Sequence, residues 1–564
     1  MRGLSPAAAG LALLLGAGTG CGNDGDGGPS EITGLRLVKA SPTWLYWEWD
    51  VPSSSRFQAS VVYLDGELVG DAESLSWNPH ELGDDYPDRT LRYDGFTATN
   101  LDPSTEHTLE VRARWSDGTT DAAGASDTAR TLPVPDRAPV CGNDVTEDGE
   151  VCDGLDLDGH ACPTRGSFTG GRLACRDDCA DYELGECVTG AVVTATSCER
   201  ADVEAALAAA AVGDVVEVPA GACDWTAPLT IDRAVTLRGA GAERTAIRFV
   251  GLAEQASGLE LAPTVDAFCR ITGFGFDGSG SPGSVYGITV RHATQFRIDH
   301  NRFTSWELSP LATSAAWVHG VIDSNTMIDC SRLGRYFGEM DAGWQHPVVL
   351  GKANQTYWED NHYSCSGAVD LGAMMSGGQG GRFVLRHNTI SCPFDTVTLG
   401  EVDAHGNQAP VCGQQDLGLE TFVPGTRCAD DDQHRGAVSI EVYANTIEIG
   451  NALGRYFSIR GGTGVIFDNV VTGEPNTMVH FWEEEAYRFA AWGNSYPGWD
   501  GIHDYHVWNN TLNGELRGGS VSAPGYAYFI RRDRDYFERP PDRPGDRHYG
   551  YEPFTYPHPL TTID

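Results

Sequence analysis

The last two-thirds of the chain repeats a short apolar run, rich in β-branched and aromatic residues, that ends in asparagine. A second, shorter apolar run usually follows. The asparagines that close the longer runs are Asn301, Asn325, Asn361, Asn388, Asn445, Asn469 and Asn510. Three intervals between neighbours are 24, 27 and 24 residues. Strand-forming repeats of this length predict stacked coils that bury one another's apolar faces. The pattern therefore predicts an all-β fold, a right-handed parallel β-helix over residues 191–564.

Asparagine suits the corner of each predicted coil for two reasons. It tolerates the left-handed backbone conformation that sharp corners need. Its side-chain amide can also donate to and accept from the asparagine one coil above or below, as in stacked amide ladders. We therefore expect the seven asparagines to form one continuous ladder.

Residues 31–137 alternate apolar and polar positions as an all-β sandwich does, with Leu45, Trp47 and Trp49 on one face of a strand. The segment from Leu101 to Ala113 resembles the E–F turn and F strand of a fibronectin type III domain. That family has tyrosine where His107 stands, so the hydrogen bond of its tyrosine corner is not expected here. The resemblance implies a spacer or interaction module.

Residues 138–190 hold six cysteines with only one close pair, Cys175 and Cys179, and no suitably placed histidine. That spacing does not favour zinc, which is bound by close cysteine pairs. Three disulfides are expected, although the sequence leaves their connectivity open. CGNDVTEDGEVCDG (residues 141–154) resembles disulfide-rich repeats of extracellular myxobacterial proteins.

The first 21 residues have the pattern of a secretion signal, with Arg2, an apolar stretch, and small residues before Cys21. The stretch is too short to span a bilayer. Residues 18–21 resemble a bacterial lipoprotein cleavage site, which implies a lipid on Cys21, and residues 22–30 follow as a flexible tether. We expect an extracellular or outer-membrane surface lipoprotein of a Gram-negative bacterium, held to the membrane only by that lipid. Simple secretion is the alternative.

Charge excludes one class of partner. The chain has 39 basic and 79 acidic residues, a formal net charge of −40. Binding to nucleic acid needs a basic surface, so it is not expected. An anionic substrate would be repelled at long range unless a local cationic stripe or a bound metal offsets this field.

The predicted β-helix begins with an alanine-rich helix at residues 202–211, which would cap the exposed end of the solenoid. Cys198 and Cys223 flank this helix, and we expect a disulfide between them that pins it to the first coil. VEVPAGACDW (residues 216–225) and LTIDRAVTLRGAG (residues 229–241) resemble the opening coils of the pectate lyase-like superfamily. YEPFTYPHPL (residues 551–560) resembles a tail of many bacterial β-helix proteins. The resemblance covers about residues 195–564.

Aligning the coils by their asparagines predicts one polar, mostly cationic row on one face. Residues at equal offsets from the ladder lie above one another, about 4.8 Å apart. Such a row costs electrostatic energy unless anions neutralise it, which suggests a binding function. The alternative is that each cation pairs with a local acid such as Asp431 or Asp432. The aligned residues are Lys352, Gln379, Arg435 and Arg460.

Two intervals between ladder asparagines are long and predict binding loops. The interval of 57 residues from Asn388 to Asn445 contains Glu401, Asp403 and His405, and also the pair Cys412 and Cys428, for which a disulfide is expected. The interval of 36 residues before Asn361 carries aromatic side chains, including Tyr336 and Trp344, that can stack on sugars or pack the loop to the coil. Cys365 and Cys392 share an offset of four residues from their asparagines, so core packing or a disulfide is expected there.

The superfamily resemblance implies a polysaccharide lyase that cleaves a uronate-containing glycan by β-elimination. A cation neutralises the substrate carboxylate, and a base then removes the C5 proton. Arg435 and Arg460 are assigned to the carboxylate and Lys352 or His405 to the base, while a Ca²⁺ ion would be held by carboxylates. The remaining candidates are Gln379, Arg382, Tyr336, Trp344 and His434 for the substrate and Asp370, Glu401 and Asp403 for Ca²⁺.

Two other functions stay open. One is a non-catalytic surface protein that binds glycans or a partner through the same face. The other is a β-helix glycoside hydrolase, which needs two facing carboxylates. In each case we expect a monomer whose partner is a polysaccharide.

Overall fold

The structure is a computed structural model. It describes residues 31–52, 54–71, 93–134, 139–281, 283, 285–315, 317–339, 343, 345–367, 374–394, 402–405, 436–450, 455–474, 477–482, 501–521, 530 and 532–563. Within these ranges no helix has both the length and the apolar character that crossing a bilayer requires.

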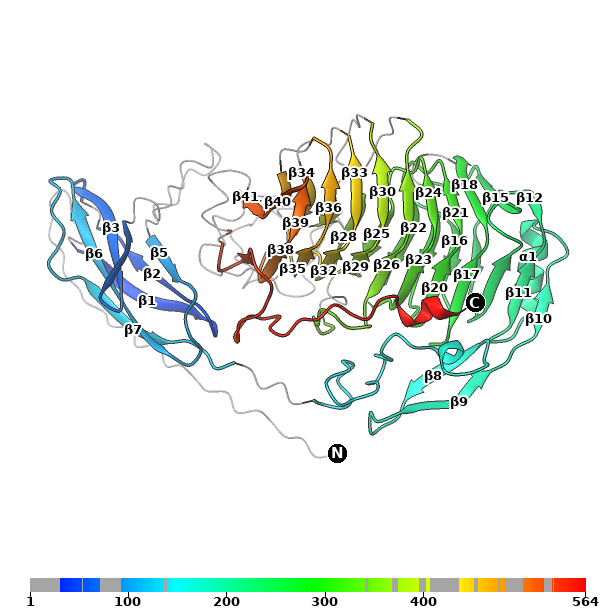
Figure 1. Cartoon of the computed structure of the whole chain (residues 1–564), viewed down its shortest axis with the longest axis horizontal. Coiled ribbons are helices and arrows are strands. Elements are labelled where there is room, and N and C mark those ends of the chain that lie inside the picture. The colour runs from blue at the N-terminus through cyan, green and yellow to red at the C-terminus, as the bar shows by residue number, and fades with distance from the viewer. Residues whose placement is uncertain are drawn as a thin grey trace, which may run out of the picture.

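Residues 192–537 form a parallel β-helix, which confirms the predicted fold class (Figure 1). A complete coil contributes one strand to each of three sheets. The described strands of the first sheet, in stacking order, are β10 (Val192–Thr194), β11 (Val215–Val218), β14 (Thr236–Gly239), β17 (Cys269–Thr272), β20 (Phe296–Asp299), β23 (Gly320–Asp323), β26 (Thr356–Glu359), β29 (Arg382–Arg386), β32 (Ser439–Tyr443), β35 (Thr463–Phe467), β38 (Tyr505–Trp508) and β42 (Tyr536–Phe537).

The other two sheets run beside the first along the same axis. The second contains β12 (Gly221–Trp225), β15 (Thr245–Val250), β18 (Gly275–Gly280), β21 (Arg302–Thr304), β24 (Thr326–Ile328), β27 (His362–Ser364), β30 (Thr389–Cys392), β33 (Thr446–Ile449), β36 (Val470–Thr472), β39 (Asn510–Leu512) and β40 (Glu515–Arg517). The third contains β13 (Leu229–Ile231), β16 (Ser257–Leu261), β19 (Tyr286–Val290), β22 (Ser309–Ser314), β25 (Gly334–Phe337), β28 (Met375–Gly378), β31 (Val402–Ala404), β34 (Arg455–Ile459), β37 (Thr477–Phe481) and β41 (Gly519–Val521).

Side chains that point inward stack from coil to coil and form one continuous apolar core. Phe249, Phe276 and Phe303 occupy successive rungs of the second sheet, with ring centroids 6.0 and 5.4 Å apart. Such a column buries aromatic area and adds stacking contacts. Cys365 and Cys392, one rung apart, are joined by a disulfide, whereas Cys269 and Cys330 are buried thiols.

The asparagine ladder forms between the first and second sheets. The Nδ2 of Asn301 donates to the Oδ1 of Asn325, and the same bond repeats at every step to Asn510. The expectation that asparagine itself would supply the left-handed corner is wrong. The residue before it has the positive φ instead, for example His387 at 55° before Asn388.

Asn388→Ala should lower the free energy of unfolding by about 2–4 kcal/mol, because it leaves buried partners without a hydrogen bond. Asn388 donates to the Trp358 carbonyl at 2.8 Å, and its Oδ1 accepts from the Asn361 amide at 3.0 Å. Denaturant unfolding measures the change. Thr389→Ala alters the next, exposed position and should cost less than about 1 kcal/mol. Equal losses in the two variants would contradict a stabilising ladder.

The first coil is closed by a helix. Helix α1 (Arg200–Ala209) packs Val203, Ala206 and Leu207 into the core at the β10 end of the solenoid. A disulfide joins Cys198 and Cys223, which ties the start of this segment to the first coil. The helix thereby covers strand edges that would otherwise be exposed.

Upstream, two antiparallel sheets enclose a separate core that includes Trp47, Trp49 and Val111. One sheet contains β1 (Thr33–Ala40), β2 (Leu45–Asp50) and β5 (Tyr93–Ala98), and the other contains β4 (Glu67–Asp71), β3 (Phe57–Leu64), β6 (Glu106–Trp115) and β7 (Ala125–Arg130). His107, at the family's tyrosine position, contacts the Asp65 carboxylate through Nδ1 at 2.7 Å.

Three disulfides hold the segment that includes β8 (Gly170–Cys175) and β9 (Tyr182–Val188), as the cysteine count predicted. The pairs are Cys141–Cys179, Cys152–Cys175 and Cys162–Cys187, a connectivity that the sequence left open.

The C-terminal tail, residues 551–563, crosses the outer face of the first sheet (red in Figure 1). It contacts β32 through a hydrogen bond from the Tyr551 hydroxyl to Glu441, and β29 through Arg386, which donates to the Phe554 carbonyl. Farther along, Arg297 of β20 donates to the Ile563 carbonyl. The tail therefore covers buried charged side chains of this face.

Glu441→Gln should flatten the pH dependence of stability. Burial raises the pKa of Glu441 to about 7, although the Tyr551 hydroxyl and the Gly351 amide both donate to its carboxylate. The folded state therefore holds a proton that the unfolded chain releases at lower pH, so stability falls as pH rises toward 7. Between pH 5 and 8 the free energy of unfolding of the variant should fall by about 2–3 kcal/mol less than that of the wild type. Denaturant unfolding at several pH values tests this, with exposed Glu448→Gln as control; equal slopes in wild type and Glu441→Gln would refute it.

Candidate functional site

The outer face of the third sheet carries two columns of polar and aromatic side chains. Strand pairing aligns the residues of the first column in successive rungs, and the residue two positions later in each strand belongs to the second. The first column is Arg335, Ser376, Asp403, Ser458 and His480. The second is Phe337, Gly378, His405, Arg460 and Trp482; its last three members follow β31, β34 and β37 directly.

An ion pair links the two columns. Arg460 donates to both carboxylate oxygens of Asp403, with Nε 3.0 Å from Oδ1. The guanidinium also lies over the Trp482 ring, 5.3 Å from its centroid, and the indole nitrogen donates to Ser458 at 2.9 Å. Asp403 and Arg460 are both buried, so the pair is fixed in place. A buried, bidentate pair of this kind holds both side chains in one geometry.

His405 lies beside this pair and is partly exposed. Its Nε2 is 3.9 Å from Asp403 Oδ2, and its side chain is 24% exposed. The neighbouring position one rung away is Gly378, where an added Cβ would meet the His405 Cβ at 3.2 Å. The imidazole therefore lies near a carboxylate, beyond hydrogen-bond distance, and keeps access to the surface.

Arg335 supplies the cation at the other end of the first column. Its Nη1 is 3.4 Å from the Tyr286 hydroxyl, and its guanidinium lies over the Phe337 ring, 4.3 Å from the centroid. Its Nε is buried and has no hydrogen-bond partner in the part of the chain that the structure describes. Burial, and to a smaller extent the charge of Arg335, lowers the pKa of nearby Arg332 to about 10. This end of the face is thus locally cationic.

The predicted single row of cations is wrong for Lys352. That residue lies at the first sheet, where its carbonyl accepts from the Tyr357 hydroxyl at 2.7 Å, and its charge acts on Asp158 of the disulfide-rich segment. It therefore occupies a different side of the solenoid from Arg460. Gln379 follows β28 on the third sheet, one position beyond the level of His405 and Arg460.

Two residues assigned to substrate binding are structural instead. Tyr336 points into the core and is fully buried, with its hydroxyl accepting from the Val318 amide at 3.2 Å. Arg382 of the first sheet is also fully buried and donates to the carbonyls of Gly343 and Pro347, both at 2.6 Å. It therefore fixes the connection that precedes β26.

Several predicted residues lie outside the residues that the structure describes, so those predictions stay as they were made. They are Arg435, Trp344, His434, Asp370, Glu401, Cys21, Cys412 and Cys428.

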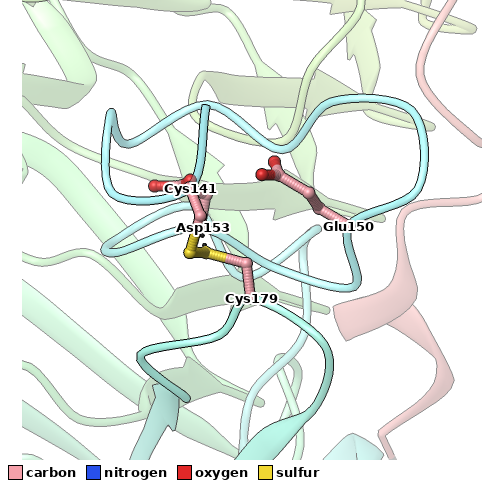
Figure 2. A group of neighbouring side chains, drawn as sticks. All are labelled: Cys141, Glu150, Asp153 and Cys179. Atoms are coloured by element: carbon pink, nitrogen blue, oxygen red, sulfur yellow. Dashed lines mark hydrogen bonds between the residues drawn. A yellow bond between two sulfur atoms is a disulfide. The ribbon is translucent and has the colours of Figure 1, made fainter. Parts of the chain in front are cut away.

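Asp403, the only described member of the expected Ca²⁺ set, does not fit that role. Both of its oxygens are bound by Arg460, and the guanidinium charge opposes a second cation there. A different cluster brings together Cys141, Glu150, Asp153 and Cys179 (Figure 2). Its two sulfurs form a disulfide and so are not thiolate ligands, and Asp153 accepts from the amides of Gly142 and Asp144. On the described residues, neither place supports a metal centre, and a Ca²⁺ site that uses Asp370 and Glu401 stays a prediction.

Sequence reasoning missed Arg335 and Trp482. Arg335 belongs to the pentapeptide LGRYF, which occurs at residues 333–337 and again at 453–457. Alternation within the first copy, with Tyr336 inward, could have placed Arg335 on the outer face. Nothing in the sequence pattern marks Trp482.

No protein-family model and no curated protein matches the chain. Solved structures show weak likenesses. A family 28 exopolygalacturonase of Yersinia enterocolitica is 12% identical over 88% of this chain and 100% of its own, with a TM-score of 0.28. The catalytic unit of a GH87 α-1,3-glucanase of Streptomyces thermodiastaticus is 13% identical over 87% of this chain and 90% of its own, with a TM-score of 0.29.

A human fibronectin type III domain is 25% identical over 22% of this chain and 100% of its own, with a TM-score of 0.13. At such scores these likenesses carry no argument about activity, and the fold rests on the sheets themselves.

Proposed function

We propose that the chain is an exported polysaccharide lyase that cleaves a uronate-containing glycan by β-elimination on the outer face of the third sheet. The observation that carries the proposal is the placement of Arg335 and His405 on that one face. They are two rungs apart, about 10 Å along the axis, which leaves room for a sugar between their side chains. A fixed cation and an imidazole are the two groups that β-elimination requires.

Arg335 would bind the substrate carboxylate. Its side chain is partly exposed and its guanidinium is held over the Phe337 ring, so a substrate carboxylate could pair with it there. Pairing with arginine withdraws charge from the carboxylate and stabilises the negative charge that develops at C5 and the carboxyl group. A local cation also offsets the repulsion that a chain with a net charge of −40 exerts on an anionic glycan.

His405 would remove the C5 proton through its neutral imidazole. The electron pair then forms the C4–C5 double bond, the C4–O bond to the next sugar breaks, and the leaving oxygen takes up a proton from water, while His405 keeps the C5 proton until it is released to solvent. Asp403, 3.9 Å away, would stabilise the imidazolium that forms through its negative charge. The product carries an unsaturated uronate at its new end.

Arg460 takes a different role from the one predicted. Because its guanidinium is already bound to Asp403 and covered by Trp482, it acts as a positioning residue that keeps the carboxylate beside His405. Among the described residues the carboxylate-binding role therefore passes to Arg335, and Arg435, outside them, keeps its predicted role.

Hydrolysis by two carboxylates is less well supported. Asp403 is the described carboxylate of the first column. Continuing the same alignment past Arg335 reaches the next one, Glu260, five rungs from Asp403 and paired with Arg291. Five rungs are about 24 Å, beyond the roughly 5–10 Å that glycosidases use.

Ultraviolet absorbance of the unsaturated uronate tests the proposal directly. The full chain is mixed with pectate, alginate and glycosaminoglycans, and we expect absorbance to rise with one of them. Arg335→Ala should reduce kcat/KM at least 100-fold, since a transition-state charge contact is worth about 3 kcal/mol. Arg248→Ala, an exposed second-sheet arginine paired with Asp224, is the matched control and should keep full activity.

Three other outcomes of this experiment would each contradict β-elimination on the outer face of the third sheet. New reducing ends without absorbance would indicate hydrolysis. Binding without turnover of any of the polymers would indicate the non-catalytic surface protein. Full activity in Arg335→Ala would remove the third sheet from the mechanism.

A further inference from the structure

A second candidate site lies where the β-sandwich meets the end of the solenoid. A cavity of about 270 Å³ lies between sandwich residues Thr43 and 100–103 and the C-terminal residues Phe537, Arg539, Arg543 and Pro544. The two walls touch: Arg543 Nη1 donates to Asn100 Oδ1 at 2.5 Å, and Gly545 packs against Pro42 and Thr43. The cavity therefore exists only when both parts of the chain are in place.

The C-terminal wall is held rigid by ion pairs. Arg539 donates to both oxygens of Asp546, at 2.6 and 2.8 Å, and lies over the Phe537 ring at 4.9 Å. Its Nε is buried without a hydrogen-bond partner among the described residues. Next to it, Arg543 has no carboxylate within ion-pairing distance in the described part of the chain, and only Asn100 accepts from its guanidinium. The guanidinium groups of Arg539 and Arg543 are thus fixed in place, and not all of their N–H donors have a hydrogen-bond partner among the described residues.

The sandwich wall offers the complementary chemistry. The Asp102 carboxylate and the Asn100 amide are exposed acceptors at the rim, and Thr43 adds a hydroxyl. Leu101, Pro103 and Pro544 supply flat apolar surfaces. A lining with few fixed polar groups between apolar faces is typical of small-ligand sites.

We propose that this junction pocket binds one or two sugar units of a saccharide. Hydroxyl groups need donors and acceptors side by side, as Arg543, Asn100 and Asp102 provide, while the apolar face of a sugar ring fits the proline and leucine surfaces. The volume lies just below the roughly 300 Å³ at which drug-sized sites begin, which limits the ligand to one or two rings. This inference does not rest on the lyase chemistry, because its residues lie at the solenoid end and not in the two columns.

Calorimetric titration of the full chain tests the pocket. The probes are digalacturonate, dimannuronate and cellobiose, added to the Arg335→Ala chain so that the third sheet does not compete. We expect one of them to bind with one-to-one stoichiometry. Adding Arg543→Ala or Asp102→Ala should weaken that binding at least tenfold, whereas Arg56→Ala, an exposed sandwich arginine paired with Asp117, should not change it.

Thermal unfolding midpoints within about 2 °C of the parent would show that the variants keep their fold, and Asn100→Ala gives a second probe of the same wall if one does not. The proposal is overturned if none of the three dimers binds the Arg335→Ala chain, or if the pocket variants bind as tightly as the parent. Failure of the lyase proposal would appear separately, as absence of unsaturated products from the wild-type chain.

Discussion

His405→Ala should reduce turnover of the uronate polymer by about 10²–10⁴-fold, the range expected when a general base is removed. The fold should persist, because the side chain is partly exposed. The strand contacts of residue 405 also run through its backbone: its amide donates to the Gly377 carbonyl, and its carbonyl accepts from the Ala437 amide. The rate is measured as the increase in absorbance under saturating substrate.

The split between kcat and KM separates this role from mere positioning. Loss of a base that acts only in the transition state lowers kcat and leaves KM nearly unchanged. His362→Ala, an exposed second-sheet histidine, is the control and should retain full turnover. A His405→Ala chain that keeps more than half of the wild-type kcat would exclude His405 as the base.

Arg386→Ala should lower the free energy of unfolding by about 3–5 kcal/mol, the cost of leaving a buried partner charge uncompensated. Arg386 is fully buried, and its Nε donates to Glu359 at 2.7 Å. Its other nitrogens donate to the Tyr443 hydroxyl and to the tail carbonyls of Phe554 and Thr555, at 2.6–2.9 Å. The variant therefore loses both the ion pair and the two hydrogen bonds from Arg386 that help to hold the tail.

Denaturant unfolding gives the stability change, and limited proteolysis followed by mass spectrometry reports cleavage of the tail. Arg248→Ala breaks an exposed pair instead and should cost about 0–1 kcal/mol. A loss below 1 kcal/mol in Arg386→Ala, with an intact tail, would show that the tail is held by other contacts.

The fold could be predicted because its signal is local and repeated. Each ladder asparagine lies two residues after the end of a first-sheet strand and at or directly before the start of a second-sheet strand. This short corner keeps its length from coil to coil. The disulfide of Cys365 and Cys392 follows from the same constant spacing, since both stand four residues after their asparagines.

The predicted cationic row was wrong for Lys352 because the connection from the third sheet to the first varies in length from coil to coil. Only residues 379–381 separate β28 from β29, and only 460–462 separate β34 from β35, so counting back from the ladder reaches the third sheet there. Between β25 and β26 the connection spans residues 338–355, and the same count lands on Lys352 within it. An offset is therefore transferable only across corners of equal length.

The repeated pentapeptide LGRYF also shows that a sequence repeat does not fix the register of a strand in the stacked sheet. Phe457, in the second LGRYF copy, is level with Val402, Met375 and Gly334. The two copies are thus displaced by three residues in the stacked sheet. The same pentapeptide therefore takes two different registers in the sheet. For this reason Arg335 could be placed at the candidate site only from the strand pairing.

The central claim is that a uronate glycan lies on the outer face of the third sheet between Arg335 and His405. A crystal structure of the His405→Ala chain with a uronate hexasaccharide, taken from whichever polymer the absorbance test selects, examines it most directly. We predict a sugar carboxylate within about 3 Å of the Arg335 guanidinium and the C5 atom of that sugar facing position 405. A hexasaccharide bound on the first or second sheet, or only in the junction pocket, would contradict the account.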